Sequence, residues 1–123
     1  MSIESHADWK GLKAAAHVAR LTLDALAKQI QPGVTTGELD ETAARLFAAH
    51  HARSAPAFTY GFPRTVLISV NDEIVHGVPG PRQLKRGDLL KLDVTAECDG
   101  YVADAARRES LGASRAHDHD HAW

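Results

Sequence analysis

Apolar residues recur at three- and four-residue steps along the first third of the chain, which is typical of an amphipathic helix. The predicted apolar stripe consists of Trp9, Leu12, Ala16, Ala19, Leu23, Leu26 and Ile30. Ser5, followed three residues later by Asp8, resembles a capping box at the start of this helix. Pro32-Gly33 predicts where it ends, because proline and glycine disfavour continued helix.

A second helix is predicted to begin near Thr36, a residue type that favours the N-cap position. Acidic residues follow at once, where they interact favourably with the positive end of the helix dipole. These residues are Glu38, Asp40 and Glu41, and the apolar face that follows consists of Leu39, Ala43, Leu46 and Phe47. His50 and His51 lie at the other end of this helix, where histidine interacts well with the dipole.

The pattern changes after the second helix, and residues 53–63 are predicted to form a loop that contains Pro56, Gly61 and Pro63. Residues 65–70 are β-branched and apolar, which predicts a strand that turns at Asn71 and Asp72. Residues 73–76 form a second short extended segment. Two helices followed by antiparallel strands predict an α+β fold in which the helices pack on the sheet.

Residues 90–97 alternate between apolar and polar side chains, which is typical of a half-buried strand. Asp99-Gly100 predicts a two-residue type I′ turn and therefore a β-hairpin. In that register Cys98 faces Tyr101, Thr95 faces Asp104, and Asp93 faces Ala106. Asp93 and Asp104 then become diagonal neighbours on one face, where side chains lie about 7 Å apart.

Two carboxylates at this spacing are able to hold two metal ions about 4 Å apart. The same alternation also fits a strand whose polar face is simply solvated, with Asp104 as one more surface charge. Two like charges on one face are unfavourable without a cation or a proton between them, which is an argument for the metal site but leaves both interpretations open. His76 has two interpretations as well: a surface residue, or a hydrogen-bond donor to a substrate carbonyl and its developing oxyanion.

Composition excludes several classes of protein. The 123 residues are 44% hydrophobic and 24% charged, which fits one globular domain. A formal charge of −2 and the lack of a basic stripe argue against nucleic-acid binding. No apolar run is long enough to span a membrane, and the first residues lack the features of a signal peptide. With Cys98 as its single cysteine, the chain is expected to be cytoplasmic.

The C-terminal residues 107–123 have a different character, with Leu111 and Trp123 as their only large apolar side chains. They are predicted to form a disordered tail that follows a domain of residues 5–106. The alternating His and Asp residues at 117–121 also suggest weak binding of a divalent cation, although a flexible tail lacks the groups that fix ligand geometry.

Several blocks of the sequence together resemble type I methionine aminopeptidase. They are residues 28–40, Gly61-Phe62-Pro63, residues 70–79 with the segment Val75-His76-Gly77, residues 87–95, and residues 99–104. The order and spacing of these blocks match the family from about Trp9 to Ala106.

The resemblance implies the N-terminal half of the pita-bread fold, in which two related α+β halves enclose a dinuclear metal centre. The family's ligands are two Asp, one His and two Glu, and the two Asp match Asp93 and Asp104. The substrate-contacting catalytic histidine matches His76. Phe62 matches an aromatic residue of the methionine pocket, and Thr59 and Leu67 match other pocket positions.

The resemblance implies removal of the N-terminal methionine from nascent proteins by a metal-bound hydroxide, with two divalent ions of Co, Mn, Fe or Zn. The sequence lacks counterparts of the His and both Glu ligands, so the ligand set is incomplete and a truncated, impaired enzyme is expected. The break in pattern at Arg107 also fits a frameshift. The alternatives are a non-catalytic half-domain that binds a partner or forms a homodimer, and metal sequestration through the tail.

Overall fold

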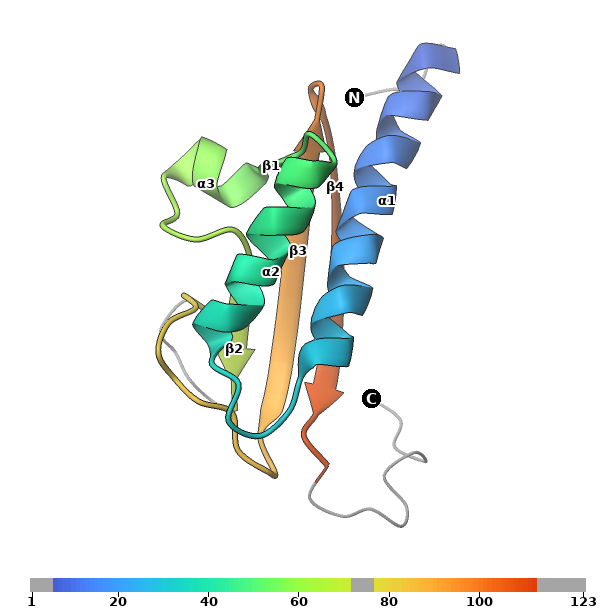
Figure 1. Cartoon of the computed structure of the whole chain (residues 1–123). Coiled ribbons are helices and arrows are strands. Elements are labelled where there is room, and N and C mark those ends of the chain that lie inside the picture. The colour runs from blue at the N-terminus through green and yellow to red at the C-terminus, as the bar shows by residue number, and fades with distance from the viewer. Residues whose placement is uncertain (1–5, 72–76, 113–123) are drawn as a thin grey trace.

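The computed structural model describes residues 6–71 and 77–112 of the chain. Two long helices, α1 and α2, pack on one face of a four-stranded antiparallel sheet, as Figure 1 shows. Strand β3 lies in the middle of the sheet, with β4 on one side and both β1 and β2 on the other. The predicted α+β class, with two helices packed on an antiparallel sheet, is therefore confirmed.

Helix α1 extends over His6–Gln29, and the face that it buries against the sheet is shifted from the stripe that the sequence predicted. Trp9, placed on that face by its spacing, is 49% exposed, and Ala16 is exposed too. The buried positions of the helix are Ala15, Val18, Ala19, Thr22, Leu23 and Leu26. Ala15 and Val18 take the place of Ala16 because the helix is rotated so that these small residues approach the sheet.

Helix α2, Thr36–Ala49, begins one residue earlier than predicted, with Thr35 and not Thr36 as its N-cap. The Thr35 hydroxyl accepts a hydrogen bond from the backbone N–H of Glu38 (3.0 Å), and the Glu38 carboxylate accepts one from the N–H of Thr35 (2.8 Å). This reciprocal pair is a capping box. Thr36 is buried instead, and its hydroxyl bonds the backbone of Gly80.

The segment predicted as a loop contains two short elements, strand β1 (Arg53–Ser54) and helix α3 (Ala55–Tyr60). The Ser54 hydroxyl caps α3 by accepting the N–H of Ala57, and Pro56 lies in its first turn. Gly61 ends the helix in the left-handed conformation, at φ +72°. Pro56 and Gly61, which suggested a loop, are thus the start and stop signals of a short helix.

The predicted hairpin is confirmed in its register. Strand β3, Leu89–Cys98, pairs with β4, Tyr101–Ser110, and every residue pair expected from the turn is present. Asp99 and Gly100 both have positive φ (52° and 90°), as a type I′ turn requires. Strand β2, Leu67–Val70, pairs with the other edge of β3, with Leu67 opposite Asp93.

Strand β4 continues past Ala106, so the predicted start of a disordered tail at Arg107 is wrong. Arg107 pairs with Leu92 and bonds Asp24 of α1 at 2.6 Å, and Leu111 is buried. The consecutive charged residues Arg107, Arg108 and Glu109 hid the strand, because one face of β4 is open to solvent. Three other predicted features lie outside the described residues: the cap at Ser5, the segment 73–76, and residues 113–123.

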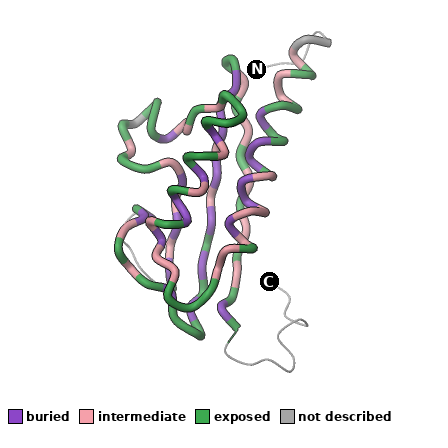
Figure 2. Tube along the Cα trace, in the orientation of Figure 1, coloured by how far each residue is buried: buried purple, intermediate pink, exposed green. Residues whose placement is uncertain are grey.

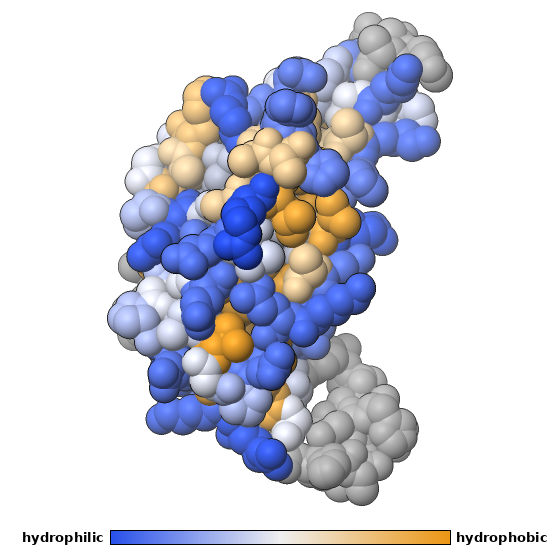
Figure 3. Space-filling view, in the orientation of Figure 1, coloured by the Kyte–Doolittle hydropathy of each residue, from blue (hydrophilic) through white to orange (hydrophobic). Residues whose placement is uncertain are grey.

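The core lies between the helices and the sheet, and Figure 2 shows its buried positions along β3 and the facing sides of α1 and α2. On the helix-covered side of the molecule, apolar surface gathers mainly between α2 and α1 (Figure 3). Among the residues that the structure describes, no helix has the length and apolarity needed to cross a bilayer.

Candidate metal and peptide site

The carboxylates of Asp93 and Asp104 lie on the face of the sheet opposite the helices, which we call the open face. Thr95 is the direct partner of Asp104, and Ala106 is the direct partner of Asp93. Asp93 and Asp104 are therefore diagonal neighbours, which places their side chains about 7 Å apart or less. We call Asp93 and Asp104 the carboxylate pair.

The environment of Asp93 disfavours a second negative charge. Burial raises the pKa of the Asp93 carboxyl above its ordinary value, and the neighbouring charge of Asp104 raises this pKa further. The Lys91 ammonium, two residues earlier on the same face, acts in the opposite direction on the pKa. A bound cation would remove both unfavourable effects, so the chemistry of these oxygen donors fits a divalent metal ion.

Replacing Asp93 with Asn is expected to stabilise the metal-free protein at pH 7 by up to about 1 kcal/mol. Because the pKa of Asp93 is raised in the folded state, protonated Asp93 contributes its full stability below the ordinary pKa of 3.8, and this contribution is lost as the pH rises through the raised pKa. Urea denaturation in EDTA should therefore separate the two proteins at pH 7 and bring them together near pH 3.5. A stability difference between wild type and Asp93→Asn that did not depend on pH would contradict this expectation. Glu41→Gln, at an exposed position, is the control.

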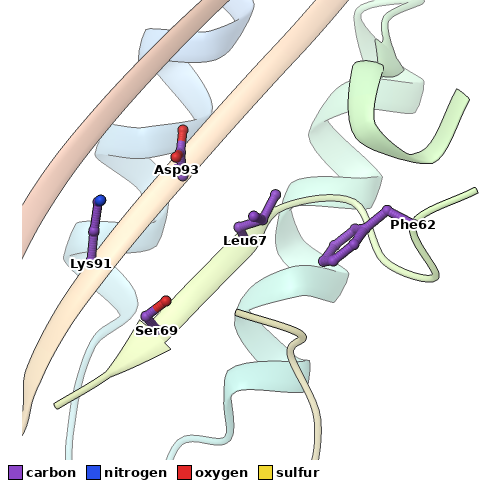
Figure 4. Close-up of a pocket in the computed structure, with 5 residues that line it drawn as sticks. All are labelled: Phe62, Leu67, Ser69, Lys91 and Asp93. Atoms are coloured by element: carbon purple, nitrogen blue, oxygen red, sulfur yellow. The ribbon is translucent and has the colours of Figure 1, made fainter. Parts of the chain in front are cut away.

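A pocket of about 390 Å³ adjoins Asp93 on the open face (Figure 4). Phe62 and Leu67 form its apolar wall, and Ser69, Lys91 and Asp93 supply polar groups. Phe62 and Leu67 were expected to line the methionine pocket, and both do lie around this space. Thr59, expected there too, is an exposed residue of α3.

Asp40 of α2 positions the wall of this pocket, a role that its sequence position did not reveal. Its carboxylate accepts hydrogen bonds from the backbone N–H groups of Thr65 (2.9 Å) and Val66 (2.8 Å), just before β2. Burial raises the pKa of Asp40, although the two N–H groups act against this. The sequence suggested only an interaction with the helix dipole, because a bond to a segment 25 residues away leaves no local pattern.

Glu97 was grouped with the polar, solvated residues of β3, but it is only 7% exposed. Its carboxylate accepts hydrogen bonds from Arg53 Nε (2.6 Å) and from the backbone N–H of Gly100 (2.5 Å). The hydrogen bond from Arg53 is the main reason that the pKa of Glu97 is lowered. Glu97 thus connects β1 to the turn that sets the register of the carboxylate pair.

His76, the predicted catalytic and substrate-binding residue, lies outside the described residues. Within residues 6–71 and 77–112, no group of three or more His, Cys, Asp or Glu side chains is arranged to hold a metal ion. In the part of the chain that the structure covers, the carboxylate pair therefore offers two carboxylates to a metal ion, with no third such group arranged beside them.

Comparison with known proteins agrees with this geometry. The sequence profile of metallopeptidase family M24 matches residues 10–122, nearly the whole chain. The chain belongs to metallopeptidase family M24. The match also includes most of the residues that were predicted to form a tail unrelated to the family.

The M24 chain is similar to methionine aminopeptidases in sequence and in fold. It is 39% identical over 114 residues to the enzyme of Staphylococcus epidermidis, which covers 93% of this chain and 45% of that protein. The crystal structure of the Rickettsia prowazekii enzyme superposes with a TM-score of 0.82 at 33% identity, over 91% of this chain and 45% of that one. The Thermotoga maritima enzyme superposes with a TM-score of 0.86 at 26% identity, over 98% of this chain and 49% of that one.

The similarity covers the N-terminal half of those enzymes, so the M24 chain spans a little under half the length of the relatives it matches. Its fold is the corresponding half of a pita-bread fold. Membership of a metallopeptidase family implies divalent metal cofactors. The carboxylate pair fits such ions by donor type and by its unfavourable charge in their absence.

Proposed function

We propose that this M24 chain forms the N-terminal half of a methionine aminopeptidase, with Asp93 and Asp104 as two of its metal ligands. The observation that carries the proposal is the carboxylate pair, held on one face by the register of the hairpin, beside a pocket with an apolar wall. The substrates would be nascent proteins with an N-terminal methionine, and the compartment would be the cytoplasm.

In this proposal each residue has one task. Asp93 and Asp104 hold two ions of Co, Mn, Fe or Zn, which when bound supply a Lewis acid and a hydroxide nucleophile. Phe62 and Leu67 contact the methionine side chain and exclude water from it. His76 donates a hydrogen bond to the oxygen of the first peptide carbonyl, where negative charge develops. The domain that does this comprises residues 5–106 and the remainder of β4.

Two carboxylates are fewer than the four to six ligands that these metals take. We therefore propose that the isolated chain is impaired, and that further ligands from another polypeptide segment are needed for full activity. With Mn²⁺ or Co²⁺ and the peptide Met-Gly-Met, the isolated chain should release little or no methionine.

A chimera provides the test. Residues 1–111 joined to the C-terminal part of the Staphylococcus epidermidis enzyme should release methionine in the presence of Mn²⁺. Asp93→Asn in the chimera should lower the rate by about 100-fold, because a metal ligand is lost. The exposed control Glu41→Gln should leave the rate unchanged. A folded chimera that is inactive with every metal, or one that tolerates Asp93→Asn, would remove the proposal.

A second candidate function is that of a non-catalytic half-domain that associates with itself or with a partner. The edge of the sheet favours this candidate, because no other described strand pairs with the second side of β4. The chimera separates the two candidates, since a half-domain without catalytic residues would give no methionine release.

A further inference from the structure

Strand β4 forms one edge of the sheet. Its ten residues pair with β3 on one side, and no other described strand lies along its second side. Alternate backbone N–H and C=O groups of an edge strand point away from its single neighbour and are free to pair with another strand. An edge of this length is usually protected by a bulge, a proline or a covering element. Residues 101–110 contain no proline, and their register with β3 is continuous.

The middle of this edge is accessible. A hollow of about 320 Å³ lies beside it, lined by Arg20 and Leu23 of α1 and by residues 104–107 of β4. The side chains of β4 that face α1 are only partly buried, so the helix does not close over the strand. Space for a further strand therefore exists at the centre of β4.

The charges of β4 are self-complementary about Ala106. When two copies of the strand pair antiparallel around a two-fold axis at Ala106, Asp104 of each copy lies opposite Arg108 of the other. Val102 then lies opposite Ser110 on the same face. On the other face, Ala105 lies opposite Arg107. The Asp104–Arg108 ion pair is therefore formed twice by one symmetry operation, which is the property of an isologous interface.

Other central registers lack this property. An axis at Asp104, Arg107 or Arg108 places two like charges directly opposite each other, which is destabilising. An axis at Ala105 puts Asp104 opposite Ala106 and leaves its charge without a partner. Only an axis at Ala106 places opposite charges opposite each other and also lets nine residues of each strand overlap.

We propose that β4 is an interaction surface for a second copy of this chain, which pairs with it antiparallel and centred on Ala106. The two sheets then become one continuous sheet with the open faces of both copies on the same side. Neither Asp104 nor Arg108 forms an ion pair within its own chain among the residues described, so both side chains are available for this pairing in the metal-free chain. The pairing uses backbone and charge, and it does not require a metal.

Sedimentation equilibrium of the whole chain tests the proposal. The wild-type protein should have twice the 13.3 kDa mass of one chain. Asp104→Arg and Arg108→Asp should each weaken association by about tenfold or more, because two attractive pairs become repulsive. The double variant Asp104→Arg/Arg108→Asp should regain wild-type association, and so should an equimolar mixture of the two single variants. A protein with Glu41→Arg and Arg86→Asp, which carries the same charge changes at exposed sites, is the control.

A monomeric wild type, or a double variant that does not regain association, would overturn the proposal. Measurements in EDTA and with the substitution Asp93→Asn distinguish the strand pairing from the metal site of the proposed function. EDTA should remove bound metal and Asp93→Asn should weaken metal binding by about 100-fold or more, and the dimer should stay intact in both cases. A dimer that dissociates in EDTA would be bridged by metal and would overturn the strand pairing, while the metal-binding role of Asp93 would stand.

Discussion

Replacing Asp40 with Ala is expected to lower the free energy of unfolding by about 2–3 kcal/mol. Asp40 is 4% exposed, and its carboxylate accepts hydrogen bonds from the backbone N–H groups of Thr65 and Val66. Alanine would leave both donors without a partner, and a buried unsatisfied donor costs about 1–3 kcal/mol. Urea denaturation at pH 7 measures the change.

Two variants make this expectation specific. Thr65 and Val66 both donate to the same oxygen, Oδ1, and Asp40→Asn keeps an acceptor oxygen there, so this variant should recover most of the loss. Glu41→Ala removes the adjacent, exposed carboxylate and should change the stability by less than about 0.5 kcal/mol. If Asp40→Ala and Glu41→Ala were equally mild, the hydrogen bonds of Asp40 would not be what holds the start of β2 against α2.

Asp93→Asn and Asp104→Asn are each expected to weaken Mn²⁺ binding by about 100-fold or more. Asparagine preserves the shape of the side chain but removes the charge that attracts the ion. Isothermal titration calorimetry in a weakly coordinating buffer gives the affinities. Glu109→Gln is the matched control, because Glu109 lies on β4 with its side chain on the opposite face of the sheet. An equal loss in Glu109→Gln would indicate a general charge effect instead of ligation.

The hairpin could be predicted from sequence because its determinants are local. Asp99-Gly100 sets the turn, and the alternation along residues 90–97 decides which side chains face the core. Together they fix the register of Asp93 and Asp104, and the structure has the same register. The choice between a metal site and a solvated strand could not be made locally, since both have the same pattern of polar residues.

The parts that sequence patterns missed depend on distant contacts. The bonds of Asp40 to Thr65 and Val66 and of Glu97 to Arg53 join segments more than 20 residues apart. Neither carboxylate differs, in its local sequence, from an ordinary surface residue. Helix α3 was missed for another reason: Pro56 and Gly61 were interpreted as loop residues although they begin and end a helical turn.

Close packing explains why Trp9 was wrongly placed in the core. Near the start of α1, Gly11 faces the ring of Tyr101, and a Cβ at Gly11 would lie 2.2 Å from that ring. The Tyr101 hydroxyl also donates a hydrogen bond to Asp8 (2.5 Å). Tyr101 lies beside the turn of the hairpin, and its ring occupies the surface that the first turns of α1 present to the sheet. A glycine at a helical position, unfavourable by propensity, thus has a packing reason.

The central claim is that a divalent metal ion binds on the open face between Asp93 and Asp104. Paramagnetic line broadening in ¹H–¹⁵N spectra, with substoichiometric Mn²⁺ added to the ¹⁵N-labelled chain, tests this claim most directly. The amide signals of Asp93, Thr95, Asp104 and Ala106 should broaden first, and Asp93→Asn should abolish the effect. Broadening centred on His50 and His51, or on residues 117–121, with the hairpin signals unaffected, would contradict the claim.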